Sequence, residues 1–209
     1  MKRLLLLVLM ACGEAPPVVP PADQPLLPLG VGHRWTFKVT DSAGVLSVKV
    51  QTVTGTVAVD GKLAFRLSTT RAEDRGTNSV QMIDAGRLLR VSEETLEAGS
   101  VKNRSRFEPY GLRVDSTKTK AGETYRDVHM RHELDASGAI VASESNDHTY
   151  TVEAEKELVT VPAGTFECVR VRREGSDGIV KTYWYAPGLG KVKETGGQTE
   201  ELSKAELAR

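Results

Sequence analysis

The feature that most restricts the fold of this chain is the two-residue period of its apolar side chains from residue 35 onward. The runs 35–39, 63–67, 128–134 and 150–152 each alternate large apolar residues with polar ones. A period of two places alternate side chains on opposite faces of a strand, whereas a helix would show a period near 3.6. The sequence therefore predicts a body built from half-buried β-strands.

Turn signals separate these runs at nearly regular spacing. They are Asp41–Gly44, Asp60–Gly61, Asp84–Gly86, Asp135–Gly138 and Ser176–Gly178. Short Asp- and Gly-containing connections join neighbouring strands antiparallel, because a parallel sheet would need long crossovers. We expect about nine to eleven strands, and a sheet of that size has to curl, close or fold over itself.

We therefore predict an all-β domain formed by a single strongly curved antiparallel sheet, as a half-barrel or barrel. A two-sheet sandwich is the alternative. Only 93–98 and 200–207 show a weak helical pattern, so we expect at most short helices. The sequence contains no internal repeat and no second linker, which predicts one domain over 29–209.

The first eleven residues have the pattern of an export signal. Lys2 and Arg3 precede seven apolar residues, 4–10, and this run is far shorter than the roughly 20 residues that span a membrane. The stretch Leu9-Met-Ala-Cys12 resembles the bacterial lipobox. That resemblance implies that residues 1–11 are removed and that Cys12 carries the lipid, with palmitate among its acyl chains. An ordinary secretory cleavage beside an incidental cysteine is the alternative.

Residues 12–28 are expected to be a lipidated tether. Six of the nine prolines lie between Gly13 and Pro28, which excludes helix and central strand there. Extended chain of this kind reaches on the order of 50 Å, enough to hold a folded body clear of lipid headgroups. Aspartate after the cysteine would favour the inner membrane, and Gly13 stands there instead. The sequence therefore favours a cell-envelope protein anchored at the outer membrane.

Charge and cysteine content exclude several classes of function. Without residues 1–11 the chain keeps 26 basic and 28 acidic side chains and has no basic stripe, which excludes a nucleic-acid partner. Once Cys12 is acylated, Cys168 is the single free thiol, so no internal disulfide can form. We interpret Cys168 as a half-buried strand residue and not as a nucleophile.

The histidines give little support for a metal site. The chain contains four histidines, His33, His129, His132 and His148. His129 and His132 are an odd number of residues apart, so one strand would direct their rings to opposite faces. His129 and Glu133 share a face, but the sequence places no third ligand beside them. We therefore predict no metal site.

Motifs for catalysis are also missing from the sequence. No Gly-x-Ser-x-Gly occurs, and the glycine pairs at 30–32 and 188–190 lack the rest of a phosphate-binding loop. The carboxylate pairs at 93–94 and 200–201 are interpreted as solvated. We predict no catalytic residue, no cofactor and no enzymatic activity.

Two stretches carry a family resemblance. Pro28-Leu-Gly-Val-Gly-His-Arg-Trp-Thr-Phe37 precedes the first strand, and Val159-Thr-Val-Pro-Ala-Gly-Thr-Phe-Glu-Cys168 is followed by Tyr183-Trp-Tyr-Ala-Pro-Gly-Leu-Gly-Lys-Val-Lys193. Physically, Ala186-Pro187-Gly188 suits a type II turn. Together these motifs resemble an uncharacterised family of bacterial lipoproteins. The resemblance implies a curved sheet similar to that of the lipoprotein carriers (LolA/LolB-like) and brings no catalytic residue. Residues 70–155 carry no motif.

Five aromatic residues near the two ends of the domain leave two functions open. Trp35, Phe37, Tyr183, Trp184 and Tyr185 either pack in the core or line an apolar groove, and alternation permits both. The sequence favours a non-enzymatic envelope component, held to the membrane by lipid on Cys12, that binds a protein or polymer partner. The alternative is a carrier or sensor of a lipid or other apolar ligand in the concave face of the sheet.

Overall fold

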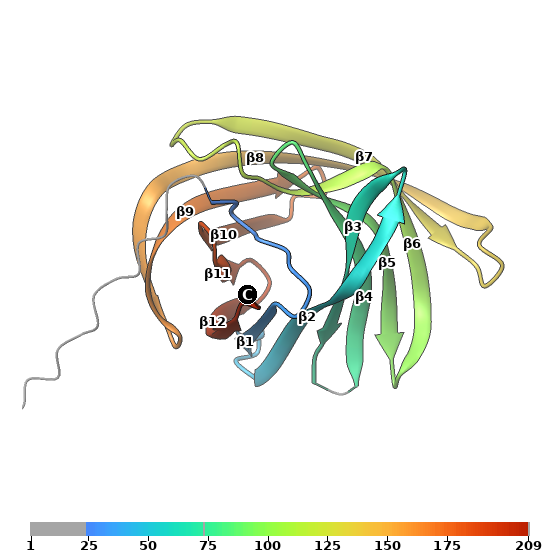
Figure 1. Cartoon of the computed structure of the whole chain (residues 1–209), viewed down its shortest axis with the longest axis horizontal. Coiled ribbons are helices and arrows are strands. Elements are labelled where there is room, and N and C mark those ends of the chain that lie inside the picture. The colour runs from blue at the N-terminus through green and yellow to red at the C-terminus, as the bar shows by residue number, and fades with distance from the viewer. Residues whose placement is uncertain (1–23, 73, 209) are drawn as a thin grey trace, which may run out of the picture.

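The chain folds into a closed barrel of twelve antiparallel strands, viewed along its opening in Figure 1. The computed structural model describes residues 24–72 and 74–208. The strands are β1 (Arg34–Thr40), β2 (Leu46–Val59), β3 (Lys62–Thr70), β4 (Arg75–Asp84), β5 (Arg87–Glu97), β6 (Ser100–Asp115), β7 (Thr124–Leu134), β8 (Ile140–Val161), β9 (Gly164–Gly175), β10 (Val180–Ala186), β11 (Gly190–Thr195) and β12 (Thr199–Glu206).

Each strand pairs with the next along the chain, and β1 closes the ring by pairing with β12. The predicted class, a strongly curved antiparallel sheet, is confirmed, and the strand number is one above the expected range. Closure pairs β1 with β12, the two strands that would be the free edges of an open sheet. The sandwich alternative is wrong.

The predicted turns lie where the sequence places them. Asp60 and Gly61 both have positive φ, 48° and 73°, as a two-residue hairpin turn requires. The type II turn after β10 is confirmed as well. Its Gly188 has φ 74°, and the Leu189 N–H donates to the carbonyl of Ala186 at 3.0 Å.

The two weak helical patches are strands. Residues 93–97 belong to β5, and 200–206 belong to β12. Both segments have strands on each side that satisfy their backbone groups, so sheet pairing overrides a weak helical preference. Throughout residues 24–72 and 74–208 there is no helix that is long and apolar enough to cross a membrane.

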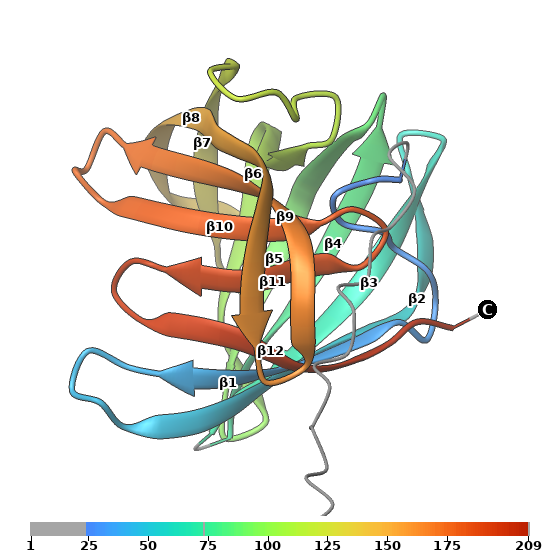
Figure 2. The ribbon, with the colours of Figure 1, turned by 90° about the vertical axis from the view of Figure 1, so that its left-hand side faces the viewer.

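The β8–β9 hairpin adds a second layer outside part of the ring. Figure 2 shows the far ends of these strands crossing in front of β10, β11 and β12. Register shifts between Val152 and Glu157 bend the hairpin there, as β-bulges do. Its tip is fixed to the barrel by a hydrogen bond from the Ala163 N–H to the Leu202 carbonyl. Val159, Val161, Phe166 and Cys168 thereby join the cluster that contains Trp35 and Leu202.

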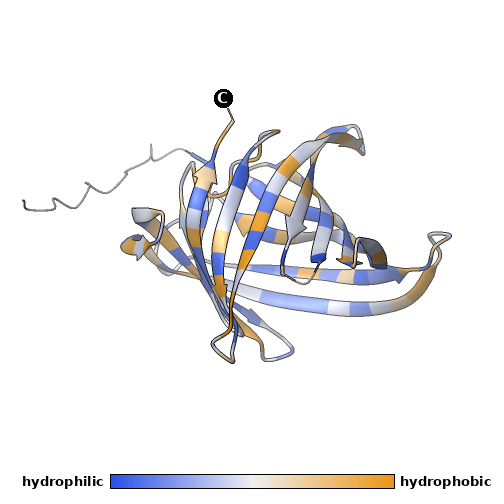
Figure 3. Cartoon of the chain, turned by 90° about the horizontal axis from the view of Figure 1, so that it is seen from below, coloured by the Kyte–Doolittle hydropathy of each residue, from blue (hydrophilic) through white to orange (hydrophobic). Residues whose placement is uncertain are grey.

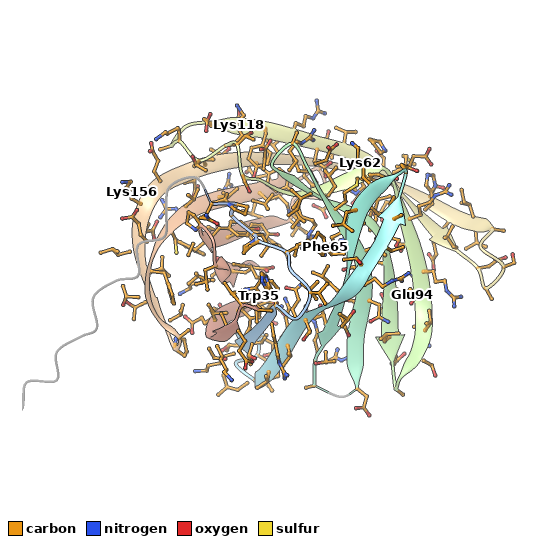
Figure 4. All side chains as sticks on the ribbon, viewed as in Figure 1. Trp35, Lys62, Phe65, Glu94, Lys118 and Lys156 are labelled. Atoms are coloured by element: carbon orange, nitrogen blue, oxygen red, sulfur yellow. The ribbon has the colours of Figure 1, made fainter. Side chains whose placement is uncertain are left out.

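Hydropathy alternates along most strands, as Figure 3 shows. In Figure 4, Trp35 lies within the ring, whereas Lys118 and Lys156 point away from it. The segment before β1 crosses the ring, and Leu26 is fully buried against β5, β6 and β8 to β10. The Pro25 carbonyl accepts a hydrogen bond from the Gly188 N–H. The folded body therefore begins by residue 25, upstream of the boundary predicted at residue 29.

Candidate functional site

The barrel encloses a cavity of about 280 Å³. Its walls come from β1 to β6 on one side of the ring and from β10 to β12 on the other, and Leu27 of the crossing segment covers part of it. The lining residues with charged or aromatic side chains are Trp35, Phe37, Lys49, Arg71, Arg90, Glu93, Arg113, Lys181, Tyr183, Tyr185, Lys191, Glu194 and Glu200. The interior of this barrel is thus both aromatic and charged.

Four aromatic side chains line the cavity in two pairs. Trp35 and Phe37 point inward from β1, and Tyr183 and Tyr185 point inward from β10. All four are at most 6% exposed. The indole N–H of Trp35 donates to the Leu189 carbonyl at 2.7 Å, which holds the ring against the type II turn. Four of the five residues predicted for a groove therefore line the same cavity.

Trp184, the fifth predicted groove residue, lies on the opposite face of β10 from Tyr183 and Tyr185. Its indole N–H donates to Glu157 of the β8–β9 hairpin at 3.1 Å. Alternation along the strand requires this placement, because neighbouring side chains point to opposite faces. Cys12, the predicted lipid site, lies outside the described residues.

A cluster of buried charges lies between the two aromatic pairs, because β11 and β12 stand between β10 and β1. The Glu200 side chain is only 1% exposed, and its carboxylate accepts from Lys49 at 2.6 Å, Lys191 at 2.7 Å and Gln198 at 2.6 Å. Lys191 also pairs with Glu194, which accepts from Lys181 at 2.8 Å. The expectation that Glu200 belongs to a solvated face is wrong, because closure of the barrel turns this face of β12 inward.

The surroundings shift the pKa values of the two buried lysines in opposite directions. Burial and the neighbouring Lys191 ammonium lower the pKa of Lys49 to about 7, although Glu200 opposes this. Burial alone would lower the pKa of Lys191, but Glu194 and Glu200 outweigh it and raise that pKa. The ring of Phe37 lies 5.3 Å from the Lys49 ammonium and 5.2 Å from that of Lys191, within range of cation–π attraction. The charge of Lys49 can therefore change near neutral pH.

A second cavity of about 240 Å³ adjoins the first, and Arg90, Glu93 and Arg113 line both. Arg90 pairs with Glu93 at 2.9 Å, but its buried Nε–H finds no acceptor among the described residues. Burial and the nearby Arg113 lower the pKa of Arg90 to about 10, so it stays charged at neutral pH. Arg113 has no ion-pair partner in the part of the chain that the structure covers. Both guanidinium groups line the cavities, and each has hydrogen-bond donors without an acceptor among the described residues.

The second cavity also contains two of the four histidines. His129 of β7 and His148 of β8 line it, and Asp127 lies beside both rings. Sequence reasoning compared His129 with His132 and missed Asp127, two residues away on the same face. His148 lies 19 positions after His129 in the chain, and only the pairing of β7 with β8 brings it opposite Asp127.

Cys168 is a strand residue of β9, as interpreted from the sequence. Its side chain is fully buried, and burial raises the pKa of the thiol to about 12. The thiol donates to the Phe166 carbonyl at 3.6 Å. A thiol with this pKa forms almost no thiolate at neutral pH and is a poor nucleophile.

The fold has a counterpart among solved structures. A Bacteroides fragilis protein, described as exported and as having a YmcC-like fold, superimposes with a TM-score of 0.58 at 14% identity, covering 88% of this chain and all of that one. A Parabacteroides distasonis protein described as a lipoprotein gives a TM-score of 0.38 at 13% identity over 88% of this chain and 99% of that one. No family model matches the sequence. No curated protein matches it either.

Proposed function

We propose that the protein is an exported, lipid-anchored component of the bacterial cell envelope that binds a small anionic ligand with an apolar portion inside its barrel. It acts by binding and not by catalysis. The anchor rests on the lipobox resemblance around Cys12. The ligand class rests on the interior of the barrel.

The observation that carries the ligand class is the excess of cations around the larger cavity. Its lining contains six basic residues, which are Lys49, Arg71, Arg90, Arg113, Lys181 and Lys191, against three carboxylates. Buried charge without a counter-charge is unfavourable, since little water remains to solvate it. An anion placed between Arg113 and Arg90 would supply the acceptors that these two side chains lack.

The aromatic lining residues indicate the apolar part of the ligand. Trp35, Phe37 and Tyr185 offer apolar surface within the same cavity as the cations. An uncharged apolar ligand would displace water from the guanidinium groups without supplying hydrogen-bond acceptors or a counter-charge. This narrows the predicted lipid or apolar ligand to one with an acidic headgroup and a short apolar part, in keeping with the cavity volume.

Two experiments test the ligand class. Native mass spectrometry of the protein purified from its own host should show a bound acidic small molecule. Calorimetric titration with octyl phosphate, octanoate and octanol should then show binding of the two acids and at least about tenfold weaker binding of the alcohol. Equal affinity for the alcohol would refute the anionic ligand.

The matched variants are Arg113→Gln and Arg172→Gln. Arg113 lines both cavities and has no ion-pair partner within the described residues, so its loss should weaken octyl phosphate binding about tenfold or more without unfolding the barrel. Arg172 pairs with Glu174 at 2.6 Å and lines neither cavity, so its variant should bind as the wild type does. An unchanged affinity in Arg113→Gln would place the ligand elsewhere.

A second candidate function, binding of an envelope partner, is favoured by the β7–β8 hairpin. Figure 1 shows this hairpin reaching past the ring of strands. It carries Ile140 and Val141 at 48% and 61% exposure. A photo-crosslinking residue at position 141 should then give a defined adduct in the native host, and one at the equally exposed Val45 should not. Identical patterns at both positions would exclude the hairpin as the binding surface.

A further inference from the structure

Three metal-binding side chains meet at the end of the smaller cavity. Asp127 and His129 point inward from β7, and His148 points inward from the paired position on β8, directly opposite Asp127. One donor atom from each residue can be chosen so that all three lie within 4.8 Å of one another. Asp127 and His129 are buried, and His148 is largely buried.

The distances between the donor atoms suit a tetrahedral metal ion. Asp127 Oδ2 lies 2.9 Å from His129 Nδ1 and 3.6 Å from His148 Nδ1. Nitrogen and oxygen ligands at about 2.0–2.1 Å from zinc, at tetrahedral angles, lie about 3.3 Å from each other. The two observed distances fall on either side of that value. The third pair of donor atoms, on His129 and His148, lies within 4.8 Å, so side-chain adjustment would bring all three groups onto one ion.

A hydrogen-bonded cluster without a metal explains only part of this arrangement. His129 can donate to Asp127 at 2.9 Å, but 3.6 Å is too long for a hydrogen bond from His148. The Nδ1 atom of His148 is buried and has no hydrogen-bond partner among the described residues. A buried ring nitrogen left in this way is unfavourable, and a metal ion between the three groups would satisfy it.

Neighbouring groups hold the first two side chains in place. The Asp127 carboxylate accepts hydrogen bonds from the His129 ring at 2.9 Å and from the Leu112 backbone N–H. Gly111 leaves space for the His129 ring, since a Cβ atom there would lie only 3.1 Å from it. The edge of the ring packs against Phe107 with the centroids 5.5 Å apart.

From this geometry we propose that Asp127, His129 and His148 bind a divalent transition metal of the zinc class, with a fourth coordination position that opens into the cavity. Two imidazoles and one carboxylate are a ligand set that zinc uses in proteins, and three protein ligands leave one position for water or an acidic ligand. The site is independent of the anion proposed for the larger cavity, because it uses none of the cations argued for there.

The test uses the full chain purified in detergent and dialysed against EDTA. Calorimetric titration with Zn²⁺ alone should show one equivalent bound, and Co²⁺ should give the visible absorption bands of a tetrahedral nitrogen–oxygen site. His148→Gln and His129→Gln should each weaken Zn²⁺ binding by about tenfold or more. The matched control is His132→Gln, because His132 lies on the same strand outside the cluster and contacts Ser143 at 2.8 Å. That control should bind Zn²⁺ as the wild type does.

The proposal would be overturned if both cluster variants still bound one equivalent of Zn²⁺, or if the wild type bound none. A measurement on the wild type guards against variants that do not fold. Imidazole nitrogen resonances of two histidines should shift on Zn²⁺ addition while those of the other two stay in place. A shift of His33 or His132 in their stead would also overturn the assignment.

Discussion

Replacement of Glu200 by glutamine tests whether the buried charge cluster holds the barrel together. The carboxylate is the shared acceptor for Lys49 and Lys191 at 2.6 and 2.7 Å, and Arg71 approaches to 3.6 Å. Removing one member of a buried ion pair typically costs about 3–5 kcal/mol, because the remaining charges lose their partner in a poorly solvated place. We expect Glu200→Gln to lose about that much unfolding free energy at pH 7.

The pKa of Glu200 gives a second estimate of the same quantity. Burial would raise that pKa, but Lys191 and Lys49 outweigh it and lower it from 4.5 to about 2. This difference corresponds to about 3 kcal/mol of stability. Because the folded-state pKa is the lower one, this stability is present above about pH 4.5 and is lost as the pH falls toward 2. The gap between wild type and Glu200→Gln should therefore shrink by about 2 kcal/mol between pH 7 and pH 3.

Urea denaturation at pH 7 and pH 3 measures both effects, and Glu201→Gln is the control. Glu201 is the next residue and points to the other face, where it pairs with Lys193 at 3.1 Å with 28% of its side chain exposed. An exposed pair of this kind contributes less than about 1 kcal/mol. Equal destabilisation by the two variants, or a gap for Glu200→Gln that does not change with pH, would refute the reasoning.

Three further predictions concern other parts of the molecule. A Cys12→Ser variant should leave the membrane pellet and take up no labelled palmitate, and a variant that stays in the pellet would rule out the lipid anchor. Gly190→Val should lower the melting temperature more than Gly138→Val does. Both glycines have positive φ, but a Cβ at Gly190 would lie 2.8 Å from Leu27, whereas nothing lies within 4 Å at Gly138. Binding of octyl phosphate should take up a proton and weaken as the pH rises above about 7, because an anion raises the pKa of Lys49. Calorimetry in buffers of different ionisation enthalpy measures that proton uptake. An affinity that does not change with pH would show that Lys49 is not coupled to the ligand.

Much of the fold was available from local features of the sequence. Alternation identified strands because one face of each is buried, and the Asp–Gly turns fixed an antiparallel order because their positive φ values suit tight hairpins. The groove prediction grouped Trp184 with Tyr183 and Tyr185, although alternation along β10 puts it on the opposite face from both. The two weak helical patches were misread, because sheet pairing on both sides decides their conformation.

Which face of each strand is the interior was decided only by closure of the barrel. Lys49 on β2 and Glu200 on β12 are 151 positions apart, and in an open sheet of twelve consecutive strands they would lie at opposite ends. Pairing of β1 with both β2 and β12 brings the two side chains into contact across Phe37. The sequence shows a period of two but cannot show that charges occupy an inward face, because that depends on partners far along the chain.

The Asp127–His129–His148 cluster shows the same limit most sharply. The two-residue spacing of Asp127 and His129 puts them on one face of a strand, a signal present in the sequence that our prediction, which compared His129 with His132 and Glu133, did not use. His148 joins them through the register of the β7–β8 hairpin, which contains a shift between Glu133 and Leu134. A slip of one residue in that register would turn the His148 ring to the outside of the barrel. Tertiary structure alone decided this, because a single bulge beside the turn sets the face of every residue that follows it.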